Sequence, residues 1–140
     1  MYIRDIVNSI CCKYDTRNPI ELADCLGIRI NYCELGSIRG FFVFKNRIKQ
    51  IFLNYNLTDY EKRFVLAHEI GHSLLHPEQN TMFLQNTFFS ANRLEIEANR
   101  FAVELLMSDE DIQEHWEYTL NEWSMFYGLP PEIIELRFKK

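Results

Sequence analysis

The spacing of apolar positions near the N-terminus predicts two helices. In the first segment the apolar residues recur at the interval of one helix face: Ile3, Ile6, Val7 and Ile10. This interval predicts an amphipathic helix over residues 2–14. A second helix is predicted to start at the cap Asn18, with Pro19 at its first position, and to stop near Gly27.

The pattern then changes to short runs rich in β-branched and aromatic residues, each bounded by Gly or Asn. These runs span residues 28–32, 40–44 and 48–53, and residues 45–47 are suited to a turn between the last two. We therefore expect a small antiparallel sheet of three strands.

Beyond the sheet the pattern is helical again. Thr58 and Glu61 form a capping box that opens a helix predicted to run to about Leu75, whereas residues 77–90 lack a clear period and are interpreted as a loop. Further helices are predicted over residues 91–107, from the cap Ser108, and from Pro131 onwards, with two helices around Gly128 as an alternative for residues 121–137. This order indicates an α+β fold, in which a three-stranded antiparallel sheet packs on a pair of helices and additional helices follow towards the C-terminus.

Composition narrows the range of functions. A length of 140 residues, of which 47% are hydrophobic, suits a single domain over residues 1–140. A net charge of −5 without a basic cluster argues against direct binding to nucleic acid and favours a protein partner. The chain shows neither a signal-peptide pattern nor a membrane-length apolar run, so we expect a cytoplasmic protein without membrane contact. Four cysteines lack the spacing of a disulfide framework or metal site and are interpreted as reduced thiols: Cys11, Cys12, Cys25 and Cys33.

The motif with the clearest chemistry is H-E-x-x-H, formed by His68, Glu69 and His72. Residues four apart share a helix face, so both imidazoles can reach one ion, and zinc accepts such ligands well. Glu69 points to a neighbouring sector, from which it can take a proton from an attacking water. The alternative is a chance match on an amphipathic helix. Apolar flanks on both sides argue against it, and so does Gly71, whose cost in a helix of roughly 1 kcal/mol relative to Ala suggests a close neighbour.

A catalytic zinc needs three protein ligands, so a third must be found downstream. His76 would place three ligands along one helix stripe, too spread for one ion, and is interpreted as a histidine favoured by the helix dipole. Glu95 lies on the small, apolar face of the next helix, where a carboxylate must be paired or bound to metal. Glu97 falls on a stripe expected to be solvated, together with Arg100, Phe101 and Glu104. We therefore predict Glu95 as the third ligand, and Asn99 as a group that orients a ligating histidine. A surface ion pair of Glu95 with Arg93 or Arg100 is the alternative.

Two segments, residues 62–76 and 95–107, resemble the signature of the ImmA/IrrE family of metallopeptidases, and the resemblance extends over about residues 28–107. It implies a zincin-like helix pair and a zinc ion held by two histidines and a glutamate. The family pattern E-x-x-A-[DN]-x-F-A then assigns the third ligand to Glu95 and not to Glu97. Ser108 stands where the family often has Pro, a departure with little bearing on the chemistry. The resemblance also implies a bacterial or phage setting, in which some members cleave helix-turn-helix repressors.

The sequence thus predicts a zinc-dependent endopeptidase that cleaves a helix-turn-helix repressor or another regulatory protein at a specific site. In this hypothesis zinc polarises the scissile carbonyl, and Glu69 deprotonates the attacking water and then protonates the leaving amine. The alternative is a non-enzymatic, metal-stabilised module that binds a regulatory partner. A purely structural site needs no base beside its ligands and is usually closed by four of them, so Glu69 favours the enzyme.

Overall fold

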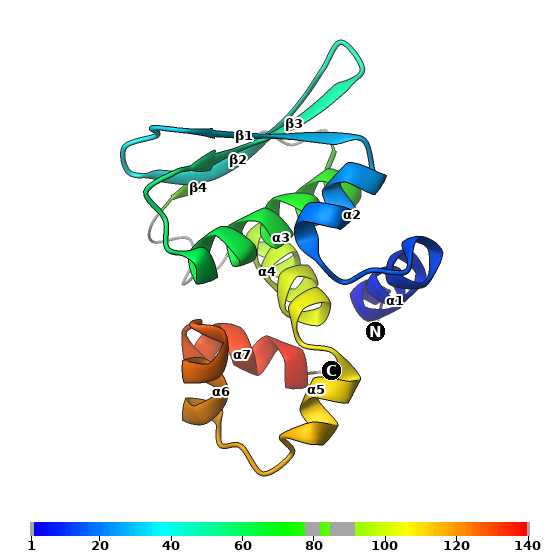
Figure 1. The fold of residues 1–140 in the computed structure, drawn as a ribbon, viewed down its shortest axis with the longest axis vertical. Coiled ribbons are helices and arrows are strands. Elements are labelled where there is room, and N and C mark those ends of the chain that lie inside the picture. Colours follow the sequence, from blue (N-terminus) through cyan, green and yellow to red (C-terminus); the bar gives the residue numbers. More distant parts are fainter. Residues whose placement is uncertain (1, 78–81, 85–91, 140) are drawn as a thin grey trace.

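The computed structural model describes residues 2–77, 82–84 and 92–139. Its elements are, in chain order, α1 (Tyr2–Tyr14), α2 (Pro19–Cys25), β1 (Ile28–Cys33), β2 (Ile38–Lys45), β3 (Ile48–Asn54), α3 (Asp59–Leu75), β4 (Met82–Leu84), α4 (Arg93–Leu106), α5 (Asp109–Glu114), α6 (Leu120–Tyr127) and α7 (Pro131–Phe138). The sheet lies along one side of α3, and α4 packs on the other side (Figure 1). The predicted α+β class and the helices towards the C-terminus are confirmed.

The sheet departs from the predicted antiparallel arrangement in the direction of its first strand. The order is β1-β3-β2-β4, and β1 pairs with β3 in parallel. Pairing between β2 and β3 is antiparallel, through a turn in which Asn46 and Arg47 have positive φ values of 53° and 65°, as the right-handed strand twist requires of a two-residue turn. The central place goes to β3 because it carries Ile51 and Leu53, both fully buried, whereas β1 is mostly accessible. The predicted antiparallel pairing is therefore wrong for β1.

A fourth strand lies within the segment that was predicted to be a loop. Residues Met82–Leu84 form β4, which pairs antiparallel with the outer edge of β2. Three residues are too few to show an alternating pattern, so periodicity could not reveal this strand. The rest of the predicted loop beyond Pro77 lies outside the described residues.

Helix α3 forms the centre of the hydrophobic core. Residues 64–73 are buried without interruption, because the sheet covers one side of α3 and α4 the other. The close neighbour expected at Gly71 is Phe101 of α4, whose Cβ would lie 3.0 Å from a Cβ added to that glycine. The contact of α3 with α4 is therefore tight at the level of the H-E-x-x-H motif.

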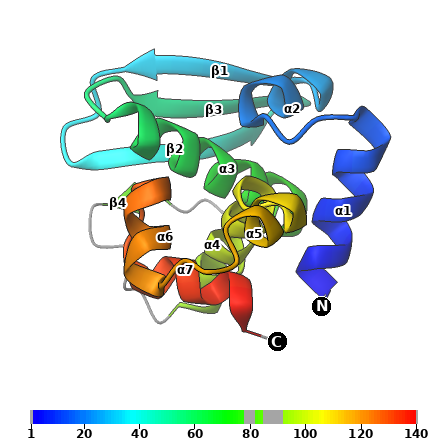
Figure 2. The ribbon, with the colours of Figure 1, turned by 60° about the horizontal axis from the view of Figure 1, so that its bottom comes forward.

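The C-terminal helices cover the far side of α4. Helices α6 and α7 pack on each other, and α7 also contacts α4 (Figures 1 and 2). They are separated by Gly128, which ends α6 in the left-handed conformation with a φ of 67°, so the two-helix alternative for residues 121–137 is confirmed. Within the described ranges, no helix is both long and apolar enough to cross a membrane.

Candidate metal centre

Helix α3 brings its polar motif into the core because its start is fixed and its middle is covered. Thr58 and Glu61 form the predicted capping box, each side chain accepting a hydrogen bond from the backbone N–H of the other. From this start, the motif falls in the buried stretch. His68, Glu69 and His72 are at most 1% exposed. Three polar side chains buried together require partners or an ion.

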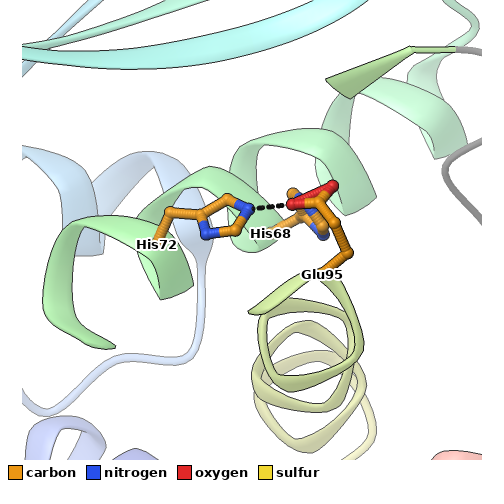
Figure 3. Close-up of side chains that lie close together, drawn as sticks. All are labelled: His68, His72 and Glu95. Atoms are coloured by element: carbon orange, nitrogen blue, oxygen red, sulfur yellow. Dashed lines mark hydrogen bonds and ion pairs between the residues drawn. The ribbon is translucent and has the colours of Figure 1, made fainter. Parts of the chain in front are cut away.

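Helix α4 supplies the carboxylate that faces this motif. Its N-cap Asn92 accepts hydrogen bonds from the backbone N–H groups of Leu94 and Glu95. The cap places Glu95 in the first turn, where its side chain points to α3 (Figure 3). The whole residue is only 6% exposed. The surface ion pair considered for Glu95 is therefore wrong, since this carboxylate is buried against the histidines.

The side chains of His68, His72 and Glu95 converge on one point between the two helices (Figure 3). Glu95 Oε1 lies 2.5 Å from His72 Nε2, and Glu95 Oε2 lies 3.6 Å from His68 Nε2. One donor atom from each residue lies within 4.8 Å of the others, a group that could hold a metal ion. The structure thus brings together the three residues that the sequence predicted as ligands.

Each histidine presents Nε2 to the cluster because its Nδ1 is occupied elsewhere. His68 Nδ1 lies 2.7 Å from Oδ1 of Asn99, which was predicted to orient a histidine. An amide oxygen only accepts, so His68 carries its proton on Nδ1 and leaves a lone pair on Nε2. His72 Nδ1 lies 3.0 Å from Nδ1 of His76. Both imidazole rings are therefore held from behind, as is usual for metal-binding histidines.

The electrostatics of the cluster suit a divalent cation. Burial lowers the pKa of the His68 imidazole, which favours the neutral ring that a metal needs. Burial would raise the pKa of the Glu95 carboxyl, but the contacts with His68 and His72 outweigh it and lower this pKa to about 2. Tetrahedral zinc with bonds of 2.0–2.2 Å separates its ligand atoms by about 3.4 Å. Small rotations of these side chains would reach that spacing, so the donor set fits zinc.

Glu69 stands beside the cluster but is not part of it. Its Oε2 lies 4.0 Å from His68 Nε2, and the residue is completely buried. Neither carboxyl oxygen has a hydrogen-bond partner among the described residues. Burial, and then the charge of Glu95, raise the pKa of this carboxyl well above its ordinary value. A nearby cation would lower that pKa again. A positive charge bound in the cluster would therefore stabilise the carboxylate form of Glu69.

The structure corrects two expectations about the remaining candidates. Glu97 is only partly solvated: its side chain is 30% exposed, and its Oε1 lies 2.7 Å from His76 Nε2, a contact that is the main reason why its pKa is lowered. Further along the stripe the prediction of solvation is wrong, because Phe101 is fully buried and Glu104 is only 3% exposed. His76 caps the C-terminal end of α3 and lies outside the metal-ligand group, but it is a partner of His72 and not only a dipole-stabilised residue.

A buried helix that carries two histidines and a glutamate, completed by a glutamate from the next helix beside a small sheet, is the arrangement of a metallopeptidase. Comparison with known families agrees with this class: residues 23–139 match the family described as Peptidase_M78, IrrE N-terminal-like domain. The chain belongs to this family, which confirms the resemblance to ImmA/IrrE proteins.

Two relatives align over nearly the whole chain. "Uncharacterized immunity region protein 2" of Bacillus phage phi105 is 40% identical over 139 residues, which cover 96% of this chain and 88% of the phage protein. "Metallopeptidase ImmA" of Bacillus subtilis (strain 168) is 31% identical over 143 residues, which cover 99% of this chain and 85% of that protein.

Proposed function

We propose that this protein is a zinc-dependent endopeptidase whose metal is held by His68, His72 and Glu95 and whose general base is Glu69. The observation that carries the proposal is Glu69 itself. A completely buried carboxyl whose oxygens lack hydrogen-bond partners among the described residues is costly to stability. Its place beside three converging donors gives it a use as a proton acceptor next to a cation.

Zinc is the cation that these donors suit best. Two imidazole nitrogens and one carboxylate are a common ligand set of catalytic zinc, and three protein ligands leave a fourth position open for water or substrate. A purely structural zinc site is usually closed by four protein ligands. Among the described residues the metal-ligand group contains three, which favours catalysis over a structural role.

The residues of this chain would divide the work of peptide hydrolysis. When bound, zinc supplies Lewis acidity that polarises the peptide carbonyl and acidifies water. Glu69 accepts a proton from the attacking water as the new C–O bond forms, and it returns that proton to the leaving amine as the C–N bond breaks. His68 and His72 would hold the ion through Nε2 and are oriented by their Nδ1 contacts. The buried position of Glu69 favours proton transfer because none of the residues that the structure describes donates a hydrogen bond to its oxygens.

The substrate that we propose is a regulatory protein of the cytoplasm, namely a DNA-binding repressor held in extended form along an edge of the sheet. Three observations support it. A relative carries the name of a phage immunity region protein, and a second carries the name of a metallopeptidase. The chain has a net charge of −5, which attracts a basic DNA-binding protein at low ionic strength.

A second function, a metal-stabilised module that binds its partner without cutting it, uses the same three ligands. It gives no role to Glu69. A buried carboxyl without a role would be replaced at little cost by glutamine or leucine, so the fate of a Glu69 variant separates the two functions.

The test compares wild type with Glu69→Gln and with the matched control Glu114→Gln, which makes the same change at an exposed position of α5. Each purified protein is loaded with zinc and incubated with a candidate substrate, a DNA-binding repressor encoded near its gene. We expect wild type and control to release a discrete fragment, and Glu69→Gln to lose roughly 10²–10⁴-fold in rate while keeping its zinc. Cleavage by Glu69→Gln at the wild-type rate would refute the base. Binding without cleavage by all three proteins would favour the module.

A further inference from the structure

We propose that His76 and Glu97 are positioning residues that hold His72 in its metal-binding orientation. This inference rests on the metal-binding role of His72 in the proposed function, but not on peptide cleavage. The pair comes from two helices: His76 is the C-cap of α3, and Glu97 lies two residues beyond Glu95 on α4.

The contacts form a continuous series that starts at the cluster of His68, His72 and Glu95. Glu95 contacts His72 at Nε2, and His72 Nδ1 lies 3.0 Å from Nδ1 of His76. At the other side of its ring, His76 Nε2 lies 2.7 Å from Oε1 of Glu97. His76 is only 8% exposed, so water competes little for these contacts.

Binding of a metal at His72 determines where the protons between His72, His76 and Glu97 lie. If Nε2 of His72 donates its lone pair to zinc, Nδ1 must carry the proton and donate it to His76. Nδ1 of His76 is then the acceptor, so its proton sits on Nε2 and is donated to the carboxylate of Glu97. Each hydrogen bond receives one proton while both rings stay neutral. A carboxylate behind a metal-binding histidine orients that ring and makes it a better ligand. Here His76 passes this effect from Glu97 to His72.

The two metal-binding histidines are thus supported in different ways. His68 is held by the side-chain oxygen of Asn99, one turn of helix beyond Glu95. His72 is held through His76, and the outer carboxylate is fixed in turn by Arg93, whose Nε lies 3.3 Å from Oε2 of Glu97. The guanidinium of Arg93 is largely exposed, so this outermost contact is weak.

The experiment measures the zinc affinity of the metal-free protein by competition with a chromophoric chelator. His76→Leu removes the acceptor for His72. We expect a loss of roughly 10–100-fold in zinc affinity, the usual effect of removing such a partner. His76→Asn returns a carbonyl oxygen to the position of Nδ1 without reaching Glu97, so it should recover the part of the affinity that does not depend on Glu97. His115→Leu makes the same change at the C-cap of α5, where His115 packs against Tyr118 and against Trp123 of α6. It should leave zinc affinity within about twofold of wild type, because His115 contacts none of the three proposed metal ligands.

Two further readouts separate positioning from general stability. The melting temperature of each metal-free variant reports any loss of packing. The visible absorption of the cobalt-loaded protein reports the geometry around the metal, and it should change in His76→Leu but not in His115→Leu. Wild-type zinc affinity in His76→Leu would overturn the inference, as would an affinity in His76→Asn as weak as in His76→Leu. If wild type binds no zinc at all, the proposed function fails together with the inference. If wild type binds zinc and the His76 variants bind it equally well, only the inference fails.

Discussion

Helix α4 carries two buried glutamates near its opposite ends, and they differ in whether positively charged side chains of the protein face them. Glu104, 3% exposed, lies 3.1 Å from Nε of Arg4 and 3.5 Å from Nε of Arg137. Glu95, 6% exposed, faces two histidines and, beyond them, the buried carboxyl of Glu69. Cations of the chain itself balance the charge of Glu104. At the other end, the negative charge of Glu95 has no arginine or lysine beside it among the described residues, and a bound metal cation would balance it.

The contrast shows that burial of a charge does not by itself identify a functional site. The Glu104 cluster joins α1, α4 and α7, since Arg4 also donates to the backbone oxygen of Arg137, and Arg137 donates to that of Met107. Each cation there has a partner, so the cluster is explained by the fold. The Glu95 cluster leaves carboxyl oxygens without hydrogen-bond partners among the described residues, and an added metal explains them.

The largest effect that separates the two clusters concerns zinc. Glu95→Gln should reduce zinc affinity by more than the roughly 10–100-fold that an outer partner contributes, because it removes a charged ligand. Glu104→Gln should retain one zinc per chain. Metal analysis after dialysis against a weak chelator measures both. Equal zinc content in the two variants would remove the distinction between the clusters.

The second effect concerns stability and is expected at the Glu104 cluster. Glu104→Ala should lower the free energy of unfolding by about 3–5 kcal/mol, because it leaves the buried guanidinium of Arg137 without its buried carboxylate and with only the largely exposed one of Asp109. Urea denaturation of the metal-free protein provides the measurement, with Glu114→Ala as the exposed control. A loss below about 1 kcal/mol would show that Asp109, 2.6 Å from Arg137, is sufficient as a partner.

The smallest effect is a gain in stability at the candidate site. In metal-free protein, Glu69→Gln should raise the free energy of unfolding by about 1–3 kcal/mol at neutral pH, because it removes a buried acid that lacks partners. The pKa of this carboxyl is raised on folding. Wild-type stability from the protonated form is therefore complete below the unfolded pKa of about 4.3 and is lost as the pH rises towards the folded value.

The difference between the two proteins should accordingly grow from pH 4 upwards, and urea denaturation over a pH series measures it. A difference that is independent of pH would mean that Glu69 does not titrate differently in the folded state. Zinc should reduce or reverse the gain, since the cation stabilises the carboxylate.

Those parts of the fold and site that depend on neighbours along one helix were predictable from the sequence. The phase of α4 distinguished Glu95 from Glu97 and placed Asn99 towards a histidine, because positions on a helix follow from a fixed rotation per residue. Gly71 indicated a close neighbour for a similar reason, namely that a glycine within a helix is costly.

The parts that depend on which elements meet were not predictable in this way. Phe101 and Glu104 are buried because α4 also contacts α1 and α7, and helix phase contains no information about a second or third covering element. The link between His76 and Glu97 joins the end of one helix to the start of another. The parallel place of β1 arises from competition among strands for the centre of the sheet, which local patterns do not report.

The most direct test of the central claim is a crystal structure of the zinc-loaded protein with anomalous data collected on both sides of the zinc absorption edge. We predict one strong anomalous peak per chain, about 2.0–2.2 Å from Nε2 of His68, Nε2 of His72 and a carboxyl oxygen of Glu95, with the Glu69 carboxyl close by but not bonded to the ion. A peak at the cysteines, or Glu69 bound in place of Glu95, would contradict the account.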